Sequence, residues 1–320
     1  MNQPAPLCET LELFTHFPIK RGVLARTVGQ VKAVDGVSIS VGRGETLGLV
    51  GESGCGKTTL GRTILGLERA TGGKILFDGT ELPSGGARPA ALRLKMQMIF
   101  QDPYSSLNPR MTVMETVTEG LAAHGLLKTG REEKARELLN EVGLDERSLW
   151  RYPHEFSGGQ RQRIAVARAL SLSPELLVCD EAVSALDVSV RAQVIRLLTD
   201  LREKFDLSYI FISHDLSVVA HIAHRVAVMY LGKIVETGPA RSVLTKPLHP
   251  YTQALCSAVP RPGRDRVNRI ILTGEPPSAA APPPGCRFHP RCPKAVDVCR
   301  TKEPASVAVD GRTVNCVLYG

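Results

Sequence analysis

The chain has 320 residues, of which 43 % are hydrophobic and 22 % charged, and its formal net charge is +8. These values are ordinary for a soluble globular protein of one large or two modest domains. No run of about 18 apolar residues is present, so no membrane span is expected. The positive charge is scattered rather than gathered in a stripe with aromatic residues, which argues against nucleic acid as a partner.

The apolar pattern of the first hundred residues predicts strands separated by short turns. They are expected at 31–41, 46–50 and 74–78, with a turn at 42–44 and a strand-like segment at 92–100. Residues 112–145 are helical in pattern, and the helical stretch at 102–158 is predicted to form a separate subdomain.

The alternation of helices and short apolar strands then resumes. A helix is predicted at 160–170, a strand at 176–180, a helix at 190–204 and a strand at 208–213. Alternation of this kind predicts an α/β fold with a mostly parallel sheet. Beyond about residue 245 the composition changes, and the stretch at 260–285, rich in Pro, Arg, Gly and Ala, predicts an irregular linker.

One segment matches the phosphate-binding pattern G-x-x-x-x-G-K-[ST] and lies between the strand at 46–50 and a predicted helix at 59–65. Such a P-loop points backbone N–H groups and a helix N-terminus at anionic oxygens. Lys57 can reach the β- and γ-phosphates, and the Thr58 hydroxyl can bind Mg²⁺. The predicted ATP contacts of this segment are Gly51, Ser53, Gly54, Cys55, Gly56, Lys57, Thr58 and Thr59.

Two carboxylates end the apolar strand at 176–180, about 130 residues after the P-loop. This is the Walker B pattern, in which Asp180 can hold Mg²⁺ and Glu181 can polarise the attacking water. A second glycine-rich turn at a helix N-terminus, Ser157-Gly-Gly-Gln160, offers another anion site.

That turn, preceded by Phe156 and followed by Arg-Gln-Arg-Ile-Ala-Val-Ala-Arg-Ala-Leu170, resembles the signature of ATP-binding-cassette (ABC) ATPases. The resemblance implies a P-loop α/β fold with a RecA-like parallel sheet core and a helical subdomain. It also implies that two cassettes pack head to tail. The residues expected to serve the partner's nucleotide are Ser157, Gly158, Gly159 and Gln160.

The same resemblance implies roles for four further residues. Gln101 matches the Q-loop glutamine that touches Mg²⁺ and water, and Asp187 matches the D-loop residue that contacts the partner cassette. His214 matches the switch histidine, which can hydrogen-bond the γ-phosphate and hold Glu181 and water in register. Phe17 matches the aromatic residue that stacks on adenine; an ordinary core aromatic is the alternative.

The C-terminal segments at 247–255, 274–278 and 285–293 resemble those of the ATPase subunits of dipeptide and oligopeptide importers, most of all the second such subunit. This implies an ATPase domain over 1–245 and a C-terminal extension over 246–320. The implied partners are a second ABC ATPase subunit, two transmembrane permease subunits and a peptide-binding protein.

The resemblance leaves the cargo open between peptides and nickel, glutathione, opines or oligosaccharides. A soluble ABC ATPase acting on nucleic acid is the rival of a different class. The N-terminus has no basic head followed by an apolar stretch, which predicts no signal peptide. The expected location is the cytoplasmic face of the bacterial inner membrane.

Four of the eight cysteines crowd the last 35 residues: Cys286, Cys292, Cys299 and Cys316. A Cys-Pro pair such as Cys292-Pro293 recurs around iron–sulfur clusters, and the resembling importer subunits can hold a [4Fe–4S] cluster here. The expectation is therefore an iron–sulfur site on these four residues. Tetrahedral zinc and metal-free cysteines are the alternatives.

Overall fold

The computed structural model describes residues 5–22, 26–84, 88–127, 129–259 and 270–320. The chain divides into two compact units: residues 1–42, 46–87 and 213–320 form the first, and residues 43–45 and 88–212 form the second.

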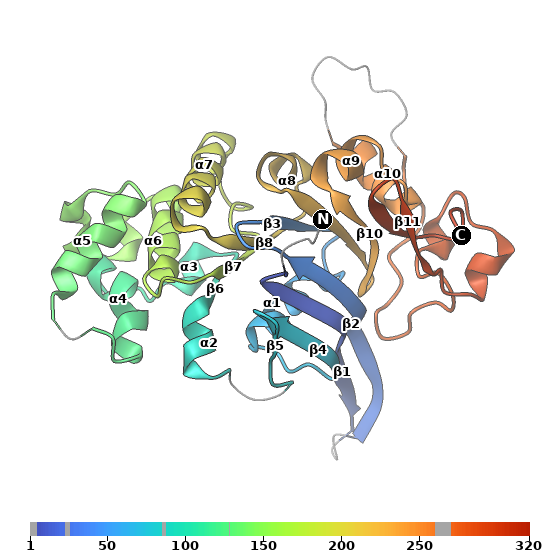
Figure 1. Ribbon diagram of the computed structural model, residues 1–320, viewed down its shortest axis with the longest axis horizontal. Coiled ribbons are helices and arrows are strands. Elements are labelled where there is room, and N and C mark those ends of the chain that lie inside the picture. Colours follow the sequence, from blue (N-terminus) through green and yellow to red (C-terminus); the bar gives the residue numbers. More distant parts are fainter. Residues whose placement is uncertain (1–4, 23–25, 85–87, 128, 260–269) are drawn as a thin grey trace. The chain divides into compact units, whose positions relative to one another are not determined.

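Four strands of the first unit form an antiparallel sheet in the order β2-β1-β4-β5 (Figure 1). The two long strands are in register from Cys8 opposite Val41 to Arg21 opposite Arg26, with shifts that leave Glu12 at a φ of 44°. Alternate residues such as Leu13, Val37 and Ile39 are buried, as expected for strands with one face on a core. The strands are β1 (Cys8–Arg21), β2 (Arg26–Val41), β4 (Gly72–Phe77) and β5 (Thr80–Glu81).

The other strands of the first unit lie in the order β11-β12-β10-β9-β3. β3 (Thr46–Val50) and β9 (Arg225–Tyr230) are parallel and almost fully buried, which their continuous apolar sequences require. β10 (Lys233–Pro239), β11 (Ser306–Val309) and β12 (Arg312–Asn315) continue antiparallel. The helices and 3₁₀ turns of this unit are α1 (Lys57–Leu65), α8 (Leu216–Ile222), α9 (Ala240–Thr245), α10 (Pro250–Ser257), η3 (His289–Arg291) and η4 (Asp297–Arg300).

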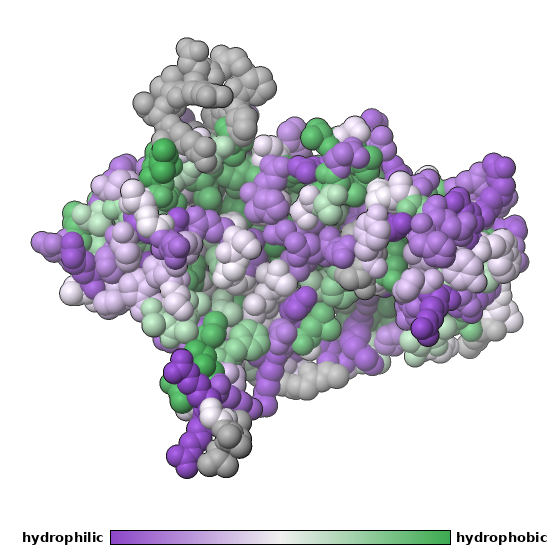
Figure 2. All heavy atoms as spheres, turned by 180° about the vertical axis from the view of Figure 1, so that it is seen from behind, coloured by the Kyte–Doolittle hydropathy of each residue, from purple (hydrophilic) through white to green (hydrophobic). Residues whose placement is uncertain are grey.

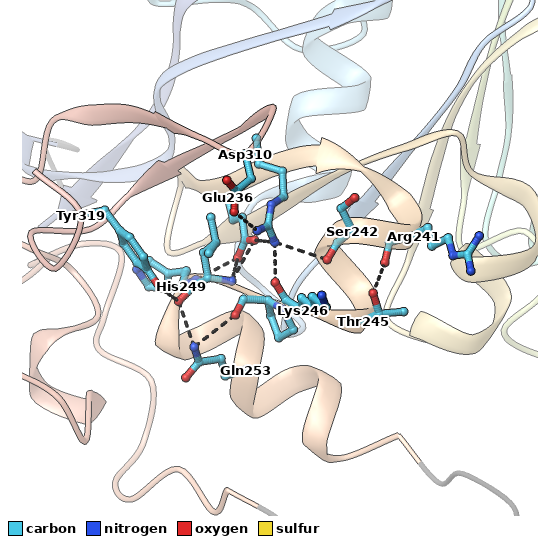
Figure 3. A network of polar contacts seen from close by, with 12 residues as sticks. Glu236, Arg241, Ser242, Thr245, Lys246, His249, Gln253, Asp310 and Tyr319 are labelled. Atoms are coloured by element: carbon cyan, nitrogen blue, oxygen red, sulfur yellow. Dashed lines mark hydrogen bonds and ion pairs between the residues drawn. The ribbon is translucent and has the colours of Figure 1, made fainter.

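A buried polar network joins the C-terminal extension to β10 (Figure 3). The fully buried Glu236 carboxylate accepts the backbone N–H groups of Leu248 and His249 at 3.0 and 2.9 Å. Arg312, at the start of β12, lies 3.8 Å from Glu236 and donates to the carbonyls of Lys246 and Ser242. The extension is thus attached by paired polar groups as well as by strand pairing.

The second unit has three parallel strands in the order β8-β7-β6, flanked by helices. The strands are β6 (Met96–Ile99), β7 (Leu176–Asp180) and β8 (Ser208–Ser213, of which Ser213 is grouped with the first unit). In its helical region α4, α5 and α6 pack on one another (Figure 1). Its helices and 3₁₀ turns are α2 (Ala90–Lys95), α3 (Pro103–Ser106), α4 (Val113–Ala123), α5 (Arg131–Glu141), η1 (Glu146–Trp150), η2 (Pro153–Glu155), α6 (Gly158–Leu170) and α7 (Val188–Phe205).

Several predicted elements are confirmed, and one is wrong. The strands expected at 176–180 and 208–213 occur with those bounds, and residues 270–285 contain no helix or strand; 260–269 lie outside the described residues. The segment at 92–100 is not one strand, because α2 occupies its first residues and β6 only Met96–Ile99. A short apolar run does not distinguish a helix turn from a strand, and here the chain forms a helix followed by a strand.

One face of the surface carries polar and apolar groups side by side (Figure 2). Figure 2 shows hydrophilic residues interspersed with smaller apolar areas over the face it presents. Among the described residues, no helix combines the length and apolar character that crossing a membrane requires.

Candidate functional site

The P-loop of the first unit joins the end of β3 to the start of α1 and needs glycine at two of its turns. Gly51 has a φ of 152° and Gly56 a φ of 109°. A Cβ atom on Gly51 would lie 2.1 Å from the Met229 carbonyl oxygen, and one on Gly56 would lie 2.0 Å from that of Ala33. The backbone is therefore packed too closely against its neighbours for any side chain at these positions.

Lys57, the first residue of α1, is only 4 % exposed, yet its charge is paired with backbone oxygens. Its Nζ donates to the carbonyls of Gly51 at 2.8 Å and Glu52 at 2.9 Å. The ammonium group is thus held inside the loop, at the N-terminus of the helix that carries Thr58 and Thr59. Ser53 and Gly54 are exposed at the tip, whereas Cys55 is buried, which raises the pKa of its thiol.

His214 follows β8 directly and is exposed. Together with Gly51 it lines a cavity of about 530 Å³ whose other walls come from Asp215, the start of α8 and the end of α10 with the two residues that follow Ser257. The structure therefore brings His214 to the same cavity as the first glycine of the P-loop.

Phe17 lies on β1 opposite Val31, and its side chain is 38 % exposed. It is therefore not an ordinary core aromatic. Phe14, on the same strand, is half-buried and instead packs edge-on against His16.

The second unit brings Gln101 and Glu181 together. β6 and β7 are parallel neighbours with Ile99 opposite Cys179, so the residues that follow them meet at the carboxyl edge of the sheet. Gln101 Nε2 donates to Glu181 Oε2 at 3.0 Å. Asp180, the last residue of β7, is 2 % exposed.

The glycine-rich turn before α6 is a helix N-cap. The Ser157 side chain accepts from the Gln160 N–H, and the Gln160 side chain accepts from the Ser157 N–H at 3.0 Å, a reciprocal capping box. Gly158 is half-buried, and Gly159 is packed so tightly that a Cβ atom there would lie 2.2 Å from a Val190 methyl group. The exposed Ser157 and Gln160 thus stand at the positive end of a 13-residue helix.

Asp187 caps the next helix, α7, by accepting from the Val190 N–H at 2.9 Å. That backbone hydrogen bond, together with one from Ser189, lowers the pKa of the Asp187 carboxyl group. Val190 therefore links two predicted motifs, because its N–H is capped by Asp187 and its side chain packs on Gly159.

The structure does not support the predicted iron–sulfur site. Among the residues that the structure describes, which include all four tail cysteines, no group of three or more His, Cys, Asp or Glu side chains is arranged to hold a metal ion. The pKa of the Cys286 thiol is raised to about 11, chiefly by burial and to a smaller extent by the other three cysteines. The four thiols are therefore within electrostatic reach of one another without forming a ligand set. Sequence spacing alone could not reveal this, because ligand geometry depends on how the extension folds.

The sequence motifs do not reveal the contacts between the C-terminal extension and the P-loop. Arg291 pairs with Glu52, and the Tyr251 hydroxyl accepts from the Glu52 N–H. Glu52 occupies a variable position of the P-loop pattern, and its partners are 199 and 239 residues away, so no local signal marks them.

Two family models match this chain. Residues 34–184 match the ABC transporter family, and residues 235–299 match the oligopeptide/dipeptide transporter C-terminal region. In fold, the chain is similar to cbiO1 from Clostridium perfringens, part of the ABC transporter complex cbiONQ, with a TM-score of 0.64 and 24 % identity over 75 % of this chain and 91 % of that one.

Two curated relatives match over nearly the whole chain. The oligopeptide transport ATP-binding protein AppF of Bacillus subtilis is 51 % identical, over 98 % of this chain and 97 % of the relative. The dipeptide transport ATP-binding protein DppF of Escherichia coli is 50 % identical, over 97 % of this chain and 94 % of the relative.

The fold, the P-loop and the family match define an ABC-type ATPase. Within that class, the chain belongs to the oligopeptide/dipeptide transporter family and is an ATP-hydrolysing subunit of such a transporter.

Proposed function

We propose that this chain binds Mg²⁺-ATP through its P-loop and that hydrolysis powers the import of dipeptides or oligopeptides by a membrane complex. The P-loop glycines supply backbone N–H groups, and Lys57 leaves its carbonyl partners to bind the β- and γ-phosphates. Phe17, exposed on β1, provides an apolar ring for adenine.

Glu181 is the proposed general base, and His214 is the residue that holds the γ-phosphate and the water in register. The observation that carries this assignment is the hydrogen bond from Gln101 to Glu181. It fixes the carboxylate at the carboxyl edge of parallel strands, where α/β proteins bind their ligands.

The proposed Mg²⁺ ligands are Thr58, Gln101 and Asp180. They offer a hydroxyl, an amide and a carboxylate, and hard oxygen donors of this kind suit Mg²⁺. When bound, the ion neutralises charge on the phosphate oxygens. Asp180 is the buried member of the set, which favours its pairing with a cation.

The proposed site is completed by a second cassette. Ser157 to Gln160 present a capped helix N-terminus with exposed polar side chains, which suits the γ-phosphate of a nucleotide on the partner's P-loop. Asp187 stands beside this turn in the proposed contact with the partner. The further partners are two permease subunits and a peptide-binding protein, which place the chain at the cytoplasmic face of the cell membrane.

The proposed domains are an ATPase domain over 1–245 and a C-terminal extension over 246–320. Peptide cargo is supported by the extension, which matches the oligopeptide/dipeptide transporter C-terminal region, and by the names of AppF and DppF. Nickel, glutathione and opines are the competing cargoes.

The cargo is tested with the assembled transporter in proteoliposomes. We expect labelled dipeptides or short oligopeptides, presented with the binding protein, to enter the vesicles and to stimulate ATP hydrolysis. Stimulation by nickel or glutathione with no response to peptides would overturn the peptide assignment and leave the ATPase intact.

The described side chains are not arranged to hold an iron–sulfur cluster or a zinc ion. The iron–sulfur site, with zinc as its alternative, is therefore a prediction that rests on the sequence alone. Its test is the iron, acid-labile sulfide and zinc content of anaerobically purified protein. About four iron and four sulfide per chain would establish the cluster, and metal-free intact protein would refute it.

A further inference from the structure

Glu52, the second residue of the P-loop, forms hydrogen bonds through its backbone N–H, its carbonyl and its carboxylate. Its backbone N–H donates to the Tyr251 hydroxyl at 2.8 Å, and its carbonyl accepts from Lys57 at 2.9 Å. Its carboxylate accepts two hydrogen bonds from Arg291, at 2.7 and 3.1 Å. Two of these three partners, Tyr251 and Arg291, belong to the C-terminal extension.

Arg291 is a buried residue of the C-terminal extension. It ends the turn η3 (His289–Arg291), and its side chain is only 7 % exposed. The hydrogen bonds to Glu52 raise its pKa, so the guanidinium group stays charged. Because a guanidinium group matches a carboxylate in a two-point contact, the pair restricts both position and orientation of Glu52.

A buried aromatic cluster supports this pair, and it consists of Tyr230, Tyr251 and Phe288. The ring centroid of Tyr230 lies 4.7 Å from that of Tyr251 and 5.2 Å from that of Phe288. All three side chains are at most 2 % exposed. Tyr230 also places its hydroxyl 3.5 Å from Arg291 Nη1. The extension therefore presents Arg291 and Tyr251 on a rigid base.

The charge of Glu52 gives this pair a functional consequence. A P-loop binds phosphate through N–H groups that must converge on one point, and an unpaired carboxylate inside the loop would repel the anion. Arg291 cancels that charge and at the same time fixes the backbone that carries it.

We propose that Arg291 is a positioning residue for ATP binding, so that the C-terminal extension forms part of the nucleotide site by clamping Glu52. This inference rests on the proposed role of the P-loop. It assigns Arg291 no contact with ATP and no part in the chemical step.

The test compares Arg291→Gln, Glu52→Gln and the double variant. Mg²⁺-ATP affinity is measured by titration of the full-length chain, and KM and kcat are measured in the assembled transporter. We expect Arg291→Gln to raise Kd and KM about tenfold, the loss typical of a hydrogen-bonded charge, with kcat within about twofold of wild type. The double variant recovers most of the affinity, because the repelling carboxylate is gone.

Arg300→Gln is the matched control, because Arg300 is an exposed arginine of the same extension and lies in the neighbouring turn η4. It should leave Kd, KM and kcat unchanged. Arg291→Lys keeps the charge but loses the two-point geometry, so an intermediate Kd is expected even if the glutamine variant fails to fold.

Three outcomes distinguish the alternatives. The clamp would be refuted if Arg291→Lys and Arg291→Gln had the Kd and KM of wild type. If Lys57→Ala lost ATP binding in the same experiment, the proposed nucleotide site would be retained. A loss of affinity that Glu52→Gln does not relieve would also refute the clamp, because the effect would then not pass through the pair. Normal binding by Lys57→Ala would instead overturn the proposed site itself.

Discussion

Gln101 Nε2 lies 3.0 Å from Glu181 Oε2, so an amide that follows β6 orients a carboxylate that follows the adjacent strand β7. The backbone supports the same arrangement, since the Glu181 N–H donates to Ile212 on β8 at 3.0 Å and its carbonyl accepts from Ser184. Gln101 thus orients the carboxylate, while Ile212 and Ser184 hold the backbone that carries it, and the proposed chemical step depends on this carboxylate.

Glu181→Gln should bind ATP normally and lose turnover by about a hundredfold to ten-thousandfold, the usual contribution of a general base. The glutamine keeps the shape of the side chain but does not accept a proton. Nucleotide binding and phosphate release are measured in the assembled transporter. Glu203→Gln, at an exposed position of α7, serves as the control. Wild-type turnover by Glu181→Gln would remove the assignment.

Lys57→Ala should weaken ATP binding by about 2 kcal/mol, near thirtyfold, because a charged donor to the phosphates is lost. Titration of the full-length chain with ATP measures the effect. Lys74→Ala removes an exposed lysine of the same unit, which pairs with the exposed Glu81, and should change nothing. An equal loss in both variants would point to net charge rather than to the P-loop.

Ser157→Ala tests the role of the signature turn in trans. The isolated chain should bind ATP as before, while turnover of the assembled complex falls, because the proposed contact is with the partner's nucleotide. The loss of an N-cap also costs about 1 kcal/mol of stability. Thr112→Ala removes the same kind of capping box from α4 and is the matched control for that cost. Equal turnover in the two variants would contradict a role in trans.

Asp35→Asn should destabilise the chain in a pH-dependent way. Burial alone would raise the pKa of the Asp35 carboxyl group, but Arg287, a hydrogen bond from His16 and the nearby charges of Lys32 and Lys233 together outweigh burial and lower it. A carboxylate whose pKa is lowered by folding stabilises the protein above its unfolded pKa, and this stabilisation is lost as the pH falls through the folded pKa. The variant should therefore lose about 3 kcal/mol near pH 7, where the buried Arg287 loses its carboxylate partner.

Urea unfolding at several pH values measures this difference. The gap between wild type and Asp35→Asn should narrow as the pH drops below about 4. Asp310→Asn, which changes an 83 % exposed carboxylate, should show no such gap. A pH-independent gap would mean that the Asp35 charge is not the cause.

Local sequence was sufficient where one element carries its own signal. The continuous apolar runs at Leu176–Asp180 and Ser208–Ser213 predicted buried strands with the correct bounds, because a strand buried on both faces admits few polar residues. The strand β1 was not predicted. Its apolar residues are broken by bulges near Glu12, so no regular alternation appears.

The sequence by itself determined the chemistry: the P-loop, the carboxylate pair Asp180-Glu181 and the signature turn are contiguous motifs whose residues can be read without a fold. Only the tertiary structure decided which side chains meet. The contact of Gln101 with Glu181 spans 80 residues and that of Arg291 with Glu52 spans 239, and neither follows from spacing along the chain. The four tail cysteines are close in sequence, yet among the described residues they are not arranged as metal ligands. Side-chain geometry depends on packing between distant segments, and that packing exists only once the chain has folded.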